Sequence, residues 1–165
     1  MGVMDVHLIP GRFTPSKGPS RGAERWLNLH HHSDTTEAVT AIQNAGYDIW
    51  VADFSKDPVT PETLPLDRPV CLWFGAELEG VSKTAQNAAT GVVTIPMRGF
   101  SQSLNVGVAS ALVMHTVCER ARKERGPDAL LGEDVRQETW NRWLTREKQM
   151  EAGIEFRSHL QLDLK

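Results

Sequence analysis

One apolar run, residues 69–74 (PVCLWF), limits the folds open to this chain more than any other segment. A strand with apolar side chains on both faces is typical of a parallel sheet that helices cover on both sides. Such a strand is usually central in its sheet. We therefore expect residues 69–74 to form a buried, central strand in a domain that also contains helices.

Predicted strands and helices alternate along the rest of the chain. The clearest helix follows Asp34, which stands three residues before Glu37 in a capping-box spacing, with apolar residues recurring up to Gly46. Strands are also predicted at residues 4–9, 26–31, 47–52 and 92–95, and helices at 82–89, 104–123 and within 128–165. This order predicts an α/β fold with a mostly parallel sheet at residues 1–126 and a helical C-terminal extension at residues 127–165.

Composition excludes several classes of protein. The longest mostly apolar stretch, residues 106–118, has 13 residues, whereas a membrane-spanning helix needs about 20. With 18 Lys and Arg against 21 Asp and Glu, the net charge of −3 offers no overall basic surface for nucleic acid. Cys71 and Cys118 lack CxxC spacing, which predicts reduced thiols, and residues 1–5 show no secretory signal. We therefore expect a cytoplasmic protein with no membrane partner.

The first segment with candidate chemistry is residues 74–82 (FGAELEGVS), where the apolar strand opens into a glycine-containing loop before a helix. Open α/β sheets bind ligands at such positions. Gly75 and Gly80 have the spacing of a P-loop, but Val81 stands where the phosphate-binding Lys is required. Without a functional role, the segment would be a strand-to-helix turn with two positive-φ glycines and a solvated Glu77.

The second segment is residues 95–109 (IPMRGFSQSLNVGVA), in which a strand ends and a loop rich in backbone donors leads into a helix. Backbone N–H and C=O groups of such a loop can hold an adenine edge, while Ile95, Met97 and Leu104 supply apolar walls. The alternative interpretation is structural, with Ser103 as the N-cap of the helix.

Together, the two segments resemble the second and third motifs of the SpoU/TrmH family of SPOUT (trefoil-knotted) RNA 2′-O-methyltransferases, in the same order and separation. The resemblance extends from residue 2 to about residue 122, and within it residues 20–26 (SRGAERW) resemble the segment before the family's second strand. The subgroup that the chain resembles most is that of the tRNA guanosine-18 enzymes. The resemblance implies a deep trefoil knot in the C-terminal part of the domain and a homodimer formed through the helix of the second segment. It also implies S-adenosyl-L-methionine as cofactor and tRNA or another structured RNA as substrate.

The resemblance further implies which residues contact the cofactor. These are Ala52, Gly75, Ile95 and Leu104. Gly75 and Ile95 would contact it through their main chain, Leu104 would cover its adenine, and Ala52 would line the same pocket. One departure from the family pattern is Gly107, where members often carry Ser.

Three further residues, Glu77, Ser103 and Asn105, would face the reacting ribose and are the implied catalytic residues. Glu77 would hold the catalytic arrangement by hydrogen bonds, and the other two would orient substrate or cofactor groups. In the family, a strand and a helix with a first motif precede the stretch that resembles residues 2–10. No residue of this chain matches the Arg of that motif, which is thought to help remove the 2′-hydroxyl proton. We therefore expect a truncated chain or a misassigned start codon, with cofactor affinity but no tRNA methylation by residues 1–165.

Other functions remain open at this point. The chain could be a catalytically inactive relative that binds RNA or cofactor, or a 2′-O-methyltransferase for another tRNA or rRNA position. An unrelated nucleotide-binding α/β protein is disfavoured, because Val81 replaces the Lys of a P-loop.

Basic residues suggest where RNA binds despite the acidic total charge. The candidates in the loop at residues 12–25 are Arg12, Lys17, Arg21 and Arg25. A second cluster at the end of the long helix contains Arg120, Arg122, Lys123 and Arg125. The alternative is that both clusters are solvated, with Glu119 and Glu124 offsetting the second.

Histidines and tryptophans allow two further interpretations. The run His30, His31 and His32 could suggest a metal site, but successive strand residues alternate faces, so we expect solvated histidines and no metal. Trp140 and Trp143 could stack on bases, but their spacing on an amphipathic helix with Val135 and Leu144 favours packing, in the core or at a dimer interface.

Overall fold

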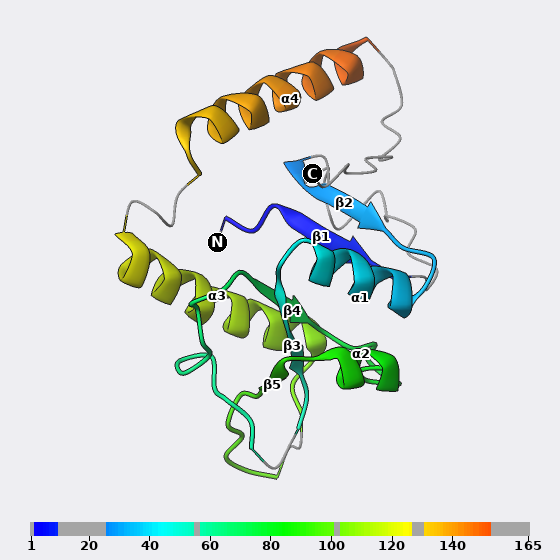
Figure 1. Cartoon of the computed structure of the whole chain (residues 1–165), viewed down its shortest axis with the longest axis vertical. Coiled ribbons are helices and arrows are strands. Elements are labelled where there is room, and N and C mark those ends of the chain that lie inside the picture. Colours follow the sequence, from blue (N-terminus) through cyan, green and yellow to red (C-terminus); the bar gives the residue numbers. More distant parts are fainter. Residues whose placement is uncertain (1, 10–25, 55–56, 101–102, 127–130, 153–165) are drawn as a thin grey trace.

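The computed structural model of the chain describes residues 2–9, 26–54, 57–100, 103–126 and 131–152, and the statements below concern these residues. In chain order the elements are β1 (Asp5–Leu8), β2 (Asn28–His31), α1 (Thr35–Asn44), β3 (Asp48–Ala52), β4 (Val70–Trp73), α2 (Lys83–Ala88), β5 (Gly91–Val93), α3 (Val106–Arg125) and α4 (Glu133–Glu151) (Figure 1). The pairings between these strands are all parallel. The predicted α/β fold with parallel sheets is therefore confirmed.

The strands form two separate sheets. β1 pairs with β2, with Asp5 opposite Asn28 at one end of the register. The other sheet has the order β4-β3-β5, and in it Trp50 lies opposite Leu72 of β4 and Gly91 of β5. β3 is thus the strand on which the larger sheet is built.

Side chains of β3 alternate between two hydrophobic cores on opposite faces of this sheet. Ile49 and Val51 pack with residues of α1 and α2, whereas Trp50 packs with Val113 and Val117 of α3. Consequently α1 and α2 cover one face and α3 covers the other, which gives three layers (Figure 1).

The prediction of a central strand at residues 69–74 is correct about its faces and wrong about its position. Cys71 and Trp73 of β4 pack on the core beneath α1 and α2, and Val70 and Leu72 pack on the core beneath α3. Among the described residues, however, β4 pairs only with β3, so β4 lies at the edge and β3 at the centre. An apolar pattern indicates which faces are covered, but the order of strands depends on backbone hydrogen bonds that this pattern does not encode.

Polar caps set the beginning of both α1 and α3. The backbone N–H of Glu37 donates to Asp34 Oδ1 (2.9 Å), and Glu37 Oε2 accepts from the backbone N–H of Ser33 (2.6 Å), so the predicted capping interactions are present. α3 begins after Asn105, slightly later than the predicted start at residue 104. It ends at Gly126, whose positive φ of 57° stops the helix.

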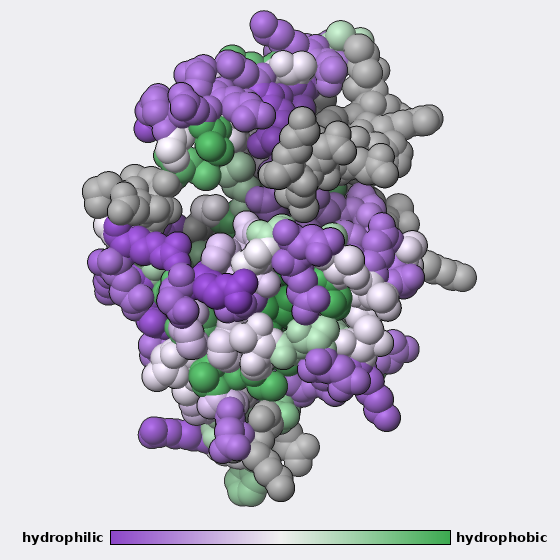
Figure 2. All heavy atoms as spheres, in the orientation of Figure 1, coloured by the Kyte–Doolittle hydropathy of each residue, from purple (hydrophilic) through white to green (hydrophobic). Residues whose placement is uncertain are grey.

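α4 packs against the segment that leads into β2. The ring of Trp143 meets that of Trp26 edge-on, with centroids 5.6 Å apart, and Arg146 Nη1 donates to the backbone oxygen of Leu27 (3.2 Å). Arg146 is buried, although Trp140 on the predicted apolar face is 55% exposed. The contact with Trp26 confirms the predicted packing for Trp143, whereas packing of Trp140 at a dimer interface stays a prediction. Hydrophilic residues dominate the outer side of α4 in Figure 2.

Two predictions from composition concern the membrane and the thiols. Of the helices that the described ranges contain, none is both long enough and apolar enough to span a bilayer. Cys71 and Cys118 are free, as predicted. Burial raises the pKa of the Cys71 thiol to about 11, so this thiol stays protonated and unreactive at neutral pH.

Histidines of both strands gather on the small β1–β2 sheet. The ring of His7 stacks on His30 and His32 at centroid distances of 4.6 and 5.1 Å, and His7 Nδ1 lies 2.8 Å from His32 Nε2. His30 Nε2 lies 2.9 Å from Asp5 Oδ1, and His30 is buried, whereas His31 is exposed. The prediction of solvated histidines is thus wrong for His30, because β1 covers it. Within the part of the chain that the structure describes, no three His, Cys, Asp or Glu side chains are arranged to hold a metal ion.

We expect the protein to lose stability as the pH falls from about 6.5 towards 4. Burial, together with the neighbouring His30 and His32, lowers the pKa of His7 from 6.5 to about 4. Between these values the unfolded chain binds a proton at this position and the folded chain does not, so acid favours unfolding. Because His7 is only half-buried, the expected loss is about 1 kcal/mol.

Urea unfolding at pH 7.5 and 4.5 measures this loss. His7→Phe, which keeps a ring in place but cannot titrate, should reduce the pH dependence, whereas His31→Phe at an exposed position should not. Asp5 does not affect the comparison of the two pH values, because a hydrogen bond from His30 lowers the pKa of its carboxyl below 3.8. The carboxyl of the folded protein is therefore ionised at both pH values. The same pH dependence in the wild type and His7→Phe would contradict the expectation.

Candidate active site

A pocket of about 470 Å³ lies at the carboxyl ends of β3, β4 and β5. Because these strands are parallel, their carboxyl ends meet at one edge of the sheet, where α/β proteins bind ligands. The lining comes from residues 52–54 after β3, from the loop after β4 and from the segment that joins β5 to α3. Its volume falls in the range of roughly 300–1,000 Å³ that is usual for small-molecule sites.

The seven residues that the resemblance marks as cofactor-binding or catalytic all line this pocket. They are Ala52, Gly75, Glu77, Ile95, Ser103, Leu104 and Asn105. Met97, predicted as an apolar wall, also lines it. Folding therefore brings both motif segments and the end of β3 to a single place.

The loop after β4 folds back tightly on itself. The N–H of Ala76 donates to the oxygen of Gly80 (3.0 Å), and the N–H of Gly80 donates to the oxygen of Ala76 (2.8 Å). A Cβ on Gly75 would lie 2.1 Å from the carbonyl carbon of Gly80 and 2.4 Å from the nitrogen of Val81. Positive φ, predicted for both glycines, holds for Gly80 (67°) and not for Gly75. Gly75 is required instead because the backbone of the same loop passes too close for any side chain.

Asn105 connects the two motif segments. Its Oδ1 accepts from the N–H groups of Gly107 (2.8 Å) and Val108 (3.4 Å), which caps α3. Its Nδ2 donates to Glu77 Oε1 at 3.1 Å. One amide therefore sets the start of α3 and the position of an otherwise exposed carboxylate at the same time, and Glu77 is not merely solvated.

The structural alternative for Ser103 is not supported, because the N-cap of α3 is Asn105. Ser103 lies two positions before the cap with an exposed side chain at the pocket, and Leu104 beside it is partly buried. Asn105 precedes the first helical residue, which is why its side chain and not that of Ser103 reaches the free N–H groups of the first turn.

Sequence reasoning missed five residues of the pocket: Asp53, Phe54, Val93, Thr94 and Val113. Asp53 and Phe54 follow Ala52 directly. Asp53 Oδ2 accepts from Gln86 Nε2 of α2 (2.8 Å), and Phe54 lies at the pocket with 63% of its surface exposed. Their position immediately after a predicted strand was a signal that could have found them. The charged side chains among the described lining residues are the acids Asp53 and Glu77.

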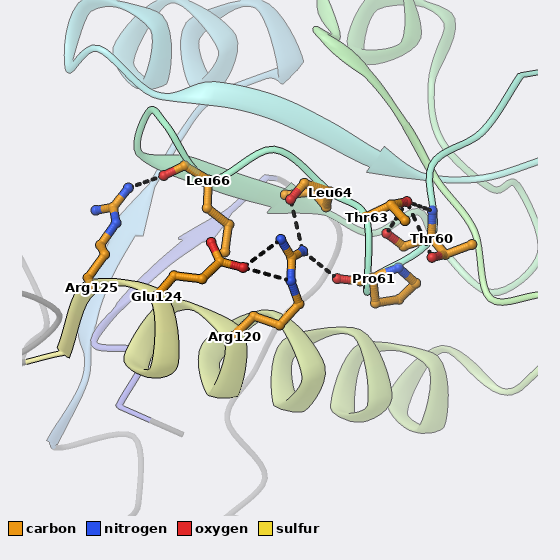
Figure 3. Close-up of polar contacts among 8 residues, drawn as sticks. All are labelled: Thr60, Pro61, Thr63, Leu64, Leu66, Arg120, Glu124 and Arg125. Atoms are coloured by element: carbon orange, nitrogen blue, oxygen red, sulfur yellow. Dashed lines mark hydrogen bonds and ion pairs between the residues drawn. The ribbon is translucent and has the colours of Figure 1, made fainter.

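Of the two basic clusters, the one at the end of α3 lies in the part of the chain that the structure describes. Arg12, Lys17, Arg21 and Arg25 lie outside the described residues. In the second cluster, Arg120 donates to the backbone oxygens of Pro61 and Leu64, and Arg125 donates to that of Leu66 (Figure 3). Neither of the two interpretations of this cluster anticipated a bond between Arg120 and the main chain of a loop.

The sheet, the pocket and its two motif segments agree with a comparison with known proteins. The model of the SpoU rRNA Methylase family matches residues 1–115. The chain therefore belongs to the SpoU rRNA methylase family.

Similar proteins include tRNA-modifying enzymes. The tRNA (guanosine(18)-2′-O)-methyltransferase of Borreliella burgdorferi is 33% identical over 135 residues, and the match covers 81% of this chain and 62% of that protein. The crystal structure of the A. aeolicus TrmH/SpoU tRNA modifying enzyme has a TM-score of 0.75 and 26% identity, and the match covers 88% of this chain and 76% of that one. The SpoU methyltransferase AviRb from Streptomyces viridochromogenes, solved in complex with AdoMet, shares the fold (TM-score 0.59, 24% identity, 72% of this chain and 51% of that one). The chain spans less than two thirds of the curated relative's length.

We expect Gly75→Ala to destabilise the protein by more than about 2 kcal/mol, because the new methyl group would overlap backbone atoms that cannot move independently. Urea unfolding measures the loss. Gly132→Ala is the matched control, since a Cβ there meets no atom within 4 Å, and it should change stability by less than about 0.5 kcal/mol. Equal stabilities of the two variants would contradict the role assigned to Gly75.

Because Asn105 both caps α3 and binds Glu77, a substitution at Glu77 should relieve the stability loss caused by a substitution at Asn105. Asn105→Asp keeps an oxygen that caps α3 but places a second carboxylate against Glu77, so we expect a loss of about 1 kcal/mol. In the variant that also carries Glu77→Gln, the new amide can donate to the carboxylate introduced at position 105, and most of the loss should disappear.

The free energy of unfolding in urea, measured for the wild type, both single variants and the double variant, gives the coupling between the two positions. Glu77→Gln alone should have little effect, because the glutamine oxygen can still accept from Asn105. Additive effects of the two substitutions would show that the bond between positions 77 and 105 has no energetic role.

Proposed function

We propose that this protein is an S-adenosyl-L-methionine-dependent tRNA (ribose 2′-O) methyltransferase that acts on guanosine 18. The observation that carries the proposal is the single pocket that unites Gly75, Glu77, Ile95 and Asn105 from two separate motifs. The named activity of the Borreliella burgdorferi relative supports the choice of reaction and nucleotide.

The pocket fits the cofactor in size and in chemistry. Ile95, Met97 and Leu104 provide apolar lining for an adenine ring, and the tight turn at Gly75 exposes main-chain groups with no side chain in the way. Ala52 completes the wall at the end of β3. When bound, the cofactor supplies an electrophilic methyl group on a positively charged sulfur.

Glu77, Ser103 and Asn105 hold the ribose that receives the methyl group. Asn105 keeps the carboxylate of Glu77 at the pocket by the 3.1 Å hydrogen bond, so that it can accept a hydrogen bond from a ribose hydroxyl. Ser103 adds a hydroxyl from the same segment. A ribose hydroxyl held by the carboxylate of Glu77 would lose much of the translational and rotational freedom that otherwise opposes transfer.

We also propose that residues 1–126 form the methyltransferase domain with a deep trefoil knot, and that residues 127–165 form an added extension. The resemblance of residues 74–82 and 95–109 to the second and third family motifs supports the knot.

The partners that we propose are a second copy of the chain and tRNA, in the cytoplasm. One face of α3 supports the homodimer, because Val108 and Leu112 are 49% and 48% exposed beside the small residues Gly107 and Ala111. The RNA-binding residues that we propose are Arg12, Lys17, Arg21 and Arg25. Metal has no role in this proposal.

Methyl transfer from labelled S-adenosyl-L-methionine to unmodified tRNA tests the function, together with cofactor affinity by calorimetry. The sequence alone predicts that residues 1–165 bind the cofactor without methylating tRNA, because no residue matches the Arg of the family's first motif. The assay decides between that expectation and the proposed activity, which requires both cofactor binding and 2′-O-methylation of guanosine 18, mapped by mass spectrometry. A tRNA with 2′-deoxyguanosine at this position should accept no methyl group.

Glu77→Ala should lower transfer by at least about tenfold, whereas Glu79→Ala, a neighbouring exposed carboxylate outside the pocket, should not. Methylation at another nucleotide would contradict the proposed substrate. Cofactor binding without transfer would favour an inactive relative, and absence of cofactor binding would overturn the proposal as a whole.

A further inference from the structure

Arg120 binds a loop near the C-terminal end of α3, whereas the motif residues lie at the start of this helix. One terminal nitrogen, Nη1, donates to the backbone oxygens of Pro61 (3.0 Å) and Leu64 (2.9 Å). The other side of the guanidinium, Nε and Nη2, donates to Glu124 Oε1 at 3.2 and 2.9 Å. Figure 3 shows the guanidinium between the loop and Glu124, and the side chain is only 24% exposed.

The loop presents these oxygens because residues 60–64 form a helical turn. The N–H groups of Thr63 and Leu64 donate to the oxygen of Thr60 (3.0 and 2.9 Å), and the N–H of Thr60 donates to Thr63 Oγ1 (3.0 Å). Backbone oxygens at the end of a single helical turn have no partner in a following turn. The guanidinium of Arg120 supplies that partner for Leu64.

The same loop packs against residues that line the pocket. Leu64 is fully buried in the core formed with Trp50, Val93 and Val113. Val59 continues the sheet beyond β5, because its N–H donates to the oxygen of Val92 (2.9 Å) and its oxygen accepts from the N–H of Thr94 (2.9 Å). Val93, Thr94 and Val113 themselves line the pocket.

We propose that Arg120 is a positioning residue for the cofactor pocket, acting through the loop at residues 59–64. By holding this loop on α3, Arg120 keeps Val59 paired with the end of β5 and Leu64 packed under Val93. The pocket wall formed by Val93, Thr94 and Ile95 is thereby held in place. This inference rests on the proposed function, since it concerns the affinity for S-adenosyl-L-methionine.

The geometry requires a guanidinium in particular. A planar fork can donate to the loop with one nitrogen and to Glu124 with the other two, whereas the single nitrogen of Lys cannot span both directions. Glu124 orients the fork by accepting from Nε and Nη2 of Arg120. Arg122 on the same helix is a matched comparison, because it forms an ion pair with Glu119 one turn earlier.

The experiment measures the dissociation constant of S-adenosyl-L-methionine for the wild type, Arg120→Gln, Arg120→Lys, Glu124→Gln and Arg122→Gln. We expect about a tenfold weaker affinity in Arg120→Gln, because two charge-assisted bonds to the loop are lost, and incomplete rescue in Arg120→Lys. Glu124→Gln, which leaves the bonds to the loop, should have a smaller effect, and Arg122→Gln should remain within about twofold of the wild type.

Hydrogen exchange separates positioning from general destabilisation. In Arg120→Lys, under conditions where circular dichroism shows a folded protein, the amides of Val59 and Thr94 should exchange faster while those of α1 keep their protection. If the wild type binds the cofactor and the Arg120 variants bind it equally well, the inference is wrong. Weaker tRNA binding with unchanged cofactor affinity would also overturn it and assign Arg120 to the RNA. If the wild type binds no cofactor, it is the proposed function that fails.

Discussion

The alternation of side chains along β3 is the constraint on which the rest of this structure depends. Ile49 and Val51 fill one core and Trp50 fills the other, so a single strand of five residues holds α1, α2 and α3 to the sheet. Because β3 also pairs on both edges, with β4 and β5, it sets where the carboxyl ends of all three strands lie. The pocket opens at that edge, so the core and the site share one scaffold.

Within the site, a few groups serve structure and chemistry together. Asn105 caps α3 and holds Glu77, and Gly75 allows the close return of a loop that carries the same Glu77. A pocket built in this way is preorganised, since its polar groups are fixed by the backbone elements that they also terminate. The part of the pocket formed by Glu77 and Asn105 therefore depends on the fold of the helix start and not on isolated side chains.

Polar side chains that reach main-chain oxygens explain several features that an apolar pattern does not. Arg120 holds the loop at residues 59–64 on α3, and Arg146 holds α4 to Leu27. In both cases a long cationic side chain satisfies buried carbonyl groups, whose desolvation without a partner is costly. Some basic residues of this mildly acidic chain, Arg120 and Arg146 among them, therefore stabilise the fold.

The sequence by itself determined the α/β class and the capping of α1 by Asp34, because periodicity and caps are local properties. The resemblance of two segments to family motifs implied the seven cofactor-binding and catalytic residues that line one pocket. Only the tertiary structure decided that β4 lies at an edge, that His30 is buried under β1 and that Asn105 rather than Ser103 begins α3. The bonds of Asn105 to Glu77 and of Arg120 to Leu64 were equally beyond prediction. They join residues 28 and 56 positions apart, and such contacts depend on how packed elements meet in space, which no local pattern records.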